Sequence, residues 1–184
     1  MKEVFNGLIQ SALDLKASHA GIAQVSQLQF VRDFRTACEQ NVCGNYNASW
    51  VCPPAIGTFD EVMNQALQFK QGLLFQTVHQ IANSVDVKGM FAAKKIHDGT
   101  FRKILDRIST MYRFSELLPL NAGSCEFCSR CAYLDHEKCR SPENAFASVE
   151  AYGIDVFHLE TALGIPYDNG ENTVSYVGLI LFKD

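Results

Sequence analysis

The chain has 184 residues, 47% of them hydrophobic and 20% charged, with a formal net charge of -4 at pH 7. These values are ordinary for a soluble globular protein and allow a substantial core. The charge gives no reason to expect nucleic acid as a partner, because nucleic-acid-binding proteins usually have a basic face. No apolar run approaches the roughly 20 residues that span a bilayer, and the first residues lack the apolar core of a signal peptide. We therefore expect a cytoplasmic protein with no membrane partner.

Hydrophobic spacing and turn residues predict the elements of the first half of the chain. These are a helix over 2–16, a strand over 21–30, helices over 31–39 and 59–70, and a strand over 72–81. The second helix places Cys38 at its end, before a loop rich in glycine, asparagine and proline. Thr58 and Glu61 have the spacing of a capping box, which marks the start of the third helix.

The second half predicts a further set of elements: a helix over 90–113, a short strand over 117–120, a helix from Asp155 to just before Gly164, and a strand over 174–182. Pro119 favours an edge position for the short strand, since proline cannot donate to a ladder. The basic residues of the long helix are interpreted as a solvated face: Lys94, Lys95, Arg102, Lys103 and Arg107.

Helices and strands intermix along the whole length, which predicts one α/β or α+β domain over residues 1–184. We expect a small mixed or antiparallel sheet, flanked by helices and by two loops that carry cysteines.

The seven cysteines are numerous for a cytoplasmic chain, and an odd number cannot pair completely within it. Clustered cysteines in a reducing compartment are more often metal ligands or catalytic groups than disulfides. They form two groups with none elsewhere: a three-cysteine group of Cys38, Cys43 and Cys52, and a four-cysteine group of Cys125, Cys128, Cys131 and Cys139.

The four-cysteine group begins with the spacing C-x2-C-x2-C, which on a tight loop lets three thiols converge on one point. Bacterial iron–sulfur sites use this trio, so a [4Fe–4S] cluster is the favoured interpretation. Structural zinc is the alternative, although zinc sites usually present two separated pairs, and unrelated buried thiols are the third. Cys139 either completes this site or reaches across to the other group, and His136 could replace a cysteine as ligand.

The three-cysteine group has the spacing C-x4-C-x8-C followed by two prolines, which is not a general metal signature. Its loop could hold a second metal centre with one position open to a substrate, or its thiols could simply be buried beside Trp50. An open iron would favour chemistry, whereas a closed four-cysteine site would favour electron transfer or a structural role.

The sequence contains no phosphate loop, nucleophile elbow or zinc-protease helix, so no catalytic residue is predicted and enzyme activity is left open. The favoured function is an iron–sulfur protein with one cluster or two, acting in electron transfer to a redox partner protein or in reductive chemistry. A zinc-stabilised interaction module without turnover is the alternative, and a thiol-based metal carrier the third. Neither a substrate nor an oligomeric state is predicted.

Three segments together resemble a known family. They are Cys38…Cys43-Gly-Asn-Tyr…Trp50-Val-Cys52-Pro-Pro, Cys125-x2-Cys128-x2-Cys131…Cys139-Arg-x-Pro142, and Ser148-Val-Glu-Ala-Tyr-Gly-Ile-Asp155-Val. This combination resembles the cysteine-rich, predicted metal-binding proteins of bacteria and archaea called domain of unknown function 2284. The resemblance implies metal or iron–sulfur binding through these cysteines and no particular reaction. The last segment has no obvious ligand and is expected to pack against the cluster loop.

Overall fold

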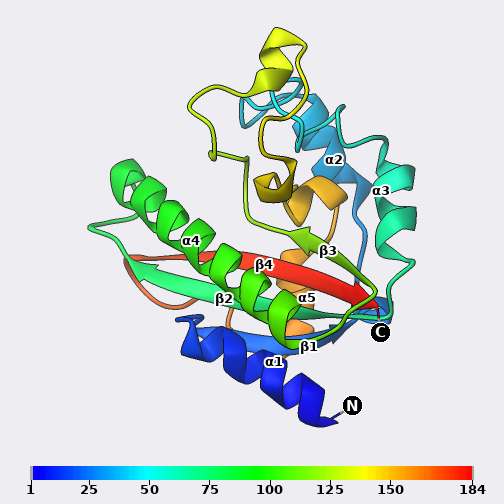
Figure 1. Cartoon of the computed structure of the whole chain (residues 1–184). Helices are drawn as coiled ribbons and strands as arrows, with labels where there is room; N and C mark the ends of the chain where they lie inside the picture. The colour runs from blue at the N-terminus through cyan, green and yellow to red at the C-terminus, as the bar shows by residue number, and fades with distance from the viewer. Residues whose placement is uncertain (1, 184) are drawn as a thin grey trace.

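One antiparallel sheet with the strand order β1-β2-β4-β3 organises the computed structural model, which describes residues 2–183 (Figure 1). The strands are β1 (His19–Gln24), β2 (Gln71–Gln80), β3 (Glu116–Leu120) and β4 (Thr173–Lys183). The central pair is β2 and β4, with Gln71 opposite Phe182 and Gln80 opposite Thr173. The edge position predicted for the strand that contains Pro119 is confirmed. The strand predicted over 21–30 is shorter, because the chain leaves β1 at Gln24 through the 3-10 turn η1 (Val25–Gln27).

Five α-helices and three further 3-10 turns complete the described chain: α1 (Lys2–Asp14), α2 (Arg32–Glu39), α3 (Phe59–Ala66), α4 (Val87–Met111), α5 (Val156–Ala162), η2 (Ala132–Asp135), η3 (Pro142–Asn144) and η4 (Glu150–Tyr152). The capping box that starts α3 is confirmed, with Glu61 N–H donating to Thr58 Oγ1 at 3.3 Å. Helix α3 ends at Ala66 and not at the predicted residue 70, since the chain turns after Ala66 to enter β2 at Gln71. Helix α4 starts earlier than residue 90, because the Asp86 carboxylate accepts the Gly89 N–H at 2.9 Å.

Alternating residues of the central strands bury the two faces of the sheet under different helices. Leu73, Phe75, Ile180 and Phe182 pack with residues of α1 and α4. Leu74, Leu179 and Leu181 pack on the opposite side with residues of α3, α5 and η4. This is the period-two alternation of a sheet covered on both sides. The protein is therefore a single compact α+β domain with an antiparallel sheet, as one of the predicted alternatives states.

The cysteine-bearing segments lie together at one end of the molecule, near α2 (Figure 1). The start of α1 and the end of β4 lie toward the opposite end. Between residues 2 and 183, no helix combines the length and the apolar character needed to cross a membrane.

Candidate metal centre

The four-cysteine group lines one small cavity. Its lining residues come from two loops: Ser49, Trp50, Val51, Cys125, Phe127, Cys128, Cys131, Ala132, Cys139, Arg140, Ser141 and Ala145. All four thiols are half-buried. All four side chains predicted as ligands, Cys139 included, thus line the same cavity.

The four-cysteine loop begins where β3 ends, at Asn121. The Asn121 N–H donates to the Ala147 carbonyl at 2.8 Å, and the Val149 N–H donates back to the Asn121 carbonyl at 2.9 Å. Asn121 and Ser148 thereby form an isolated parallel bridge. The segment after the loop returns beside the segment before it, which fixes both ends of the loop.

Charged side chains connect the middle of this loop to its end. Arg130 pairs with Asp135 at 2.9 Å, and Arg140 pairs with Asp135 at 3.6 Å and with Glu137 at 3.3 Å. The Arg140 guanidinium also donates to the Arg130 carbonyl at 3.1 Å. Exposed ion pairs contribute little stability each. These pairs join separate parts of one loop, so together they restrict its conformation.

Two aromatic residues join the four-cysteine loop to the loop of the three-cysteine group. Trp50 Nε1 donates to the Glu137 carbonyl at 2.9 Å, and the Tyr133 hydroxyl donates to Asn47 Oδ1 at 2.7 Å. The two rings pack edge to face, with 5.0 Å between their centroids. Segments more than eighty positions apart in the chain therefore form one unit.

Arg102 reaches the four-cysteine loop from α4. Its guanidinium lies 4.9 Å from the ring centroid of Phe127 and 5.2 Å from that of Phe146, and it donates to the Asn144 carbonyl at 2.9 Å. The prediction of a solvated basic face is therefore wrong for Arg102. It is also wrong for Lys94, which is 6% exposed. No local signal reveals this, because the partners of Arg102 lie on a distant loop.

Two thiols of the four-cysteine group differ in their electrostatic surroundings. Burial raises the pKa of Cys125, opposed by the Phe127 backbone N–H and by the charge of Arg102. Burial also raises the pKa of Cys131, but the backbone N–H groups of Tyr133 and Trp50, the Ser49 hydroxyl and Arg140 outweigh it, and the net shift is downward. Cys131 Sγ lies 3.9 Å from Ser49 Oγ. Donors are thus in place to stabilise a thiolate, the form that binds metal.

The three-cysteine group lies beside this site. Cys38 is half-buried near the end of α2, Cys43 is exposed, and Cys52 is buried. Burial, followed by repulsion from Cys43, raises the pKa of Cys38. Burial, followed by the neighbouring thiols Cys43, Cys38 and Cys125, raises the pKa of Cys52 to about 11. The two groups are therefore close enough to interact electrostatically through Cys52 and Cys125.

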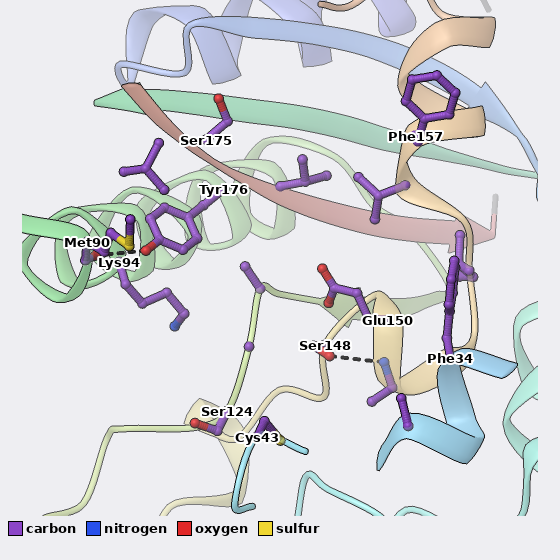
Figure 2. Close-up of a pocket in the computed structure, with 18 of the residues that line it drawn as sticks. Phe34, Cys43, Met90, Lys94, Ser124, Ser148, Glu150, Phe157, Ser175 and Tyr176 are labelled. Carbon is purple, nitrogen blue, oxygen red and sulfur yellow. Dashed lines mark hydrogen bonds between the residues drawn. The ribbon is translucent and has the colours of Figure 1, made fainter. Parts of the chain in front are cut away.

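The three-cysteine group also lines a large cavity of about 1040 Å³ (Figure 2). The wall of this cavity includes residues of α2, α4, η4, α5 and β4, together with the segments around Ser124 and Asp168. Cys125, Cys128, Cys131 and Cys139 are not part of that wall. The sequence predicted that these cysteines could be ligands. It did not predict the cavity, because the cavity wall is assembled from separate segments.

Arg35 holds α2, the helix that carries Cys38, against two neighbouring segments. It is only 3% exposed, and its guanidinium donates to the Ala151 carbonyl at 3.0 Å and to the Gly57 carbonyl. These bonds attach α2 to η4 and to the turn before α3. The segment 148–155, expected to pack against the cluster loop, forms the Asn121–Ser148 bridge at the start of that loop. Its other residues pack in the core and against α2.

The donor set of the four-cysteine group is all sulfur, which suits zinc or an iron–sulfur cluster. Within residues 2–183, no three or more His, Cys, Asp or Glu side chains are arranged to hold a single metal ion. His136 is exposed with φ of 57°, and it does not line the small cavity.

The comparisons with known proteins give one result. No curated protein and no solved structure matches the chain significantly. The family described as predicted metal-binding protein (DUF2284) matches residues 22–182, which include all seven cysteines and the four strands except the ends of β1 and β4. The chain therefore belongs to this family of predicted metal-binding proteins.

Proposed function

We propose that the protein is an iron–sulfur protein in which Cys125, Cys128, Cys131 and Cys139 hold a [4Fe–4S] cluster. The observation that carries the proposal is that these four half-buried thiols line one small cavity. A cubane takes four thiolates from a compact loop, and the spacing C-x2-C-x2-C supplies three of them. Bound there, the cluster would supply one-electron redox chemistry.

The surroundings of the four-cysteine group support electron transfer as the role of this site. All four ligand positions would come from the chain, which leaves none for a substrate. Arg102 and Arg140 bring positive charge near the thiolates, and hydrogen bonds to sulfur come from the Trp50 and Tyr133 N–H groups. Charge and hydrogen bonding of this kind raise the reduction potential of a cluster. The electrons would be exchanged with a redox partner protein.

The three-cysteine group supports a second centre. It offers three thiols, and they belong to the wall of the large cavity. A centre held by three residues of the chain has one position free for a molecule in that cavity, which would make reductive chemistry part of the function. This extension depends on the first proposal and on the iron content.

The test is the content of iron, acid-labile sulfide and zinc per chain after purification without oxygen. About four irons and four sulfides support the four-cysteine cluster alone, and about eight of each support both centres. About one zinc without sulfide would contradict the proposal and would favour a zinc-stabilised interaction module. In that case a chelator should unfold the protein without any change in visible absorbance, since zinc-site binding energy is folding energy.

A further inference from the structure

The large cavity has the size and lining of a small-molecule site. Its volume of about 1040 Å³ matches the upper range of known ligand pockets. Six of its lining residues are large apolar or aromatic side chains that are exposed to solvent: Phe34, Val42, Val87, Phe91, Phe157 and Tyr167. Phe91 and Phe157 are 59% and 58% exposed. Apolar side chains gathered in this way in a concave site indicate a binding surface.

The charges of the cavity wall are unbalanced. Five carboxyl groups belong to the wall: Glu126, Glu150, Asp155, Glu160 and Asp168. Its one basic residue is Lys94, whose ammonium group is already bound by Asp98 at 2.6 and 2.7 Å. Within residues 2–183, none of the five carboxyl groups forms an ion pair with a basic side chain. The wall therefore has more acidic than basic groups, and a cation in the cavity would favour the ionised form of Glu150 and Glu160, whose pKa burial raises.

Some of these carboxyl groups have structural roles, and others do not. Asp155 caps α5 by accepting the His158 N–H at 2.9 Å, Asp168 accepts the Gly170 N–H at 2.9 Å, and Glu160 accepts from Gln76 at 2.6 Å. Within residues 2–183, Glu150 caps no helix. It lies in the first turn of η4, where bonds from its own backbone and from the Ser148 side chain oppose the effect of burial on its pKa. Its side chain projects into the space between Lys94, Tyr176 and Phe34 (Figure 2).

Glu150 is accessible from the open side of the cavity, yet protein surrounds its carboxylate closely enough that burial raises its pKa. A cation beside it would replace the hydration that the carboxylate has lost. Phe34 lies across this space from Lys94 in Figure 2, and Phe157, on α5, belongs to the same cavity wall. Aromatic faces attract cations as well as apolar groups.

We propose that the large cavity binds a small organic cation with an apolar body, whose charged nitrogen lies at Glu150 and whose body packs on Phe34 and Phe157. The inference goes beyond the proposed iron–sulfur function and does not depend on it. The three-cysteine group belongs to the same wall, so the ligand would lie beside any second centre.

The experiment compares three probes of similar size on the full chain as purified without oxygen: benzyltrimethylammonium, benzyl alcohol and phenylacetate. Binding is measured by saturation-transfer NMR and by calorimetry. We expect the cation to bind about tenfold more tightly than the neutral probe, and the anion most weakly. Equal affinity for all three would overturn the charge selection. No binding of any probe at millimolar concentration would overturn the small-molecule site itself and leave the apolar rim to a macromolecular partner.

Two variants localise the site. Glu150→Gln should remove the preference for the cation while leaving benzyl alcohol affinity unchanged, and the control Glu3→Gln, on the distant helix α1, should leave both unchanged. Phe157→Ser should lower the affinity for all three probes by a similar factor. A cation preference that survives Glu150→Gln in a protein with an unchanged melting temperature would overturn the assignment of Glu150. Because all variants are compared at the same metal content, these outcomes do not depend on whether the bound metal is iron or zinc.

Discussion

The two cysteine groups of this chain are neighbours, but they are held in different ways. The four-cysteine group lies on an irregular loop that is braced by its own ion pairs and joined to a second loop by Trp50 and Tyr133. The three-cysteine group is attached to regular structure, because Cys38 belongs to α2 and Arg35 binds that helix to η4. One set of thiols shares a small cavity, and the other lies on the wall of a large one.

This difference shows that the same side chain has two kinds of surroundings in one molecule, and the proposed function assigns each a different role. A closed set of four thiols protects what it holds, which suits storage or passage of electrons. An open set of three, beside an apolar and acidic cavity, presents what it holds to another molecule. The predictions below test whether the two groups really divide in this way.

The largest expected effect separates the groups by metal content. Cys131→Ala removes one ligand of the closed site and should lose about four irons and four sulfides per chain. Cys43→Ser alters only the open group and should keep the visible absorbance of the closed site. Both variants are assayed for iron, sulfide and absorbance after anaerobic purification. Loss of all iron from Cys43→Ser would show that the groups form one centre.

The next prediction concerns the support of the open group. Arg35→Met leaves the buried Ala151 carbonyl and the half-buried Gly57 carbonyl without their charged donor, and should lower the free energy of unfolding by about 2–4 kcal/mol. Arg32→Met, on the same helix, removes an exposed pair with Asp60 and should cost about 0–1 kcal/mol. Urea denaturation of the two variants measures the difference. Equal costs would show that α2 does not depend on its buried arginine.

A third prediction uses the pH dependence of the large cavity. Burial, partly offset by the bond from Gln76, raises the pKa of Glu160 from 4.5 to about 7. The unfolded chain therefore releases this proton at lower pH than the folded chain, so stability falls as pH rises from 4.5 to about 7. Glu160→Gln removes that loss and should gain about 1–3 kcal/mol over the native protein above pH 7, with no gain below pH 4.5. Thermal unfolding across this range measures it.

The exposed Glu171→Gln serves as the control for Glu160 and should follow the native protein at every pH. A gain for Glu160→Gln that is the same at all pH values would mean that the effect is packing rather than ionisation.

The smallest expected effect concerns the hydrogen bond by which Trp50 joins its loop to the four-cysteine loop. Trp50→Phe keeps an aromatic ring but removes the bond from Nε1 to the Glu137 carbonyl, which should cost about 1 kcal/mol. The alkylation rate of Cys128 in the metal-free chain should rise severalfold, since the loops separate more often. Tyr167→Phe, at the rim of the large cavity, should leave that rate unchanged. An unchanged rate in Trp50→Phe would show that the four-cysteine loop is closed without this hydrogen bond.

Local sequence signals predicted the sheet and most of the helices. The capping box at Thr58 and Glu61, the cap at Asp155 and the edge strand with Pro119 depend on residues within a few positions of one another. The grouping of the cysteines was also visible, because the spacing C-x2-C-x2-C is local. Such features can be inferred without knowing the rest of the fold.

Features that join distant segments could not be inferred in the same way. Arg102 and Lys94 lie on a helix whose pattern favours solvent exposure. Arg102 is half-buried against the ring of Phe127, and Lys94 pairs with Asp98, whose carboxylate also accepts from Asn121 on a distant segment. The large cavity needs residues from α2, α4, α5 and β4 together, and no spacing within one segment reports such a combination. The extent of β1 was overestimated, because the turn at η1 interrupts a run that still alternates.

The position of the chain ends has a practical consequence. The start of α1 and the end of β4 lie away from the cysteine-bearing segments (Figure 1). A tag or linker joined at either end would leave both cavities uncovered. The protein could therefore be tethered to a sensor chip through α1, with its thiol-bearing end facing the solution, for ligand screening.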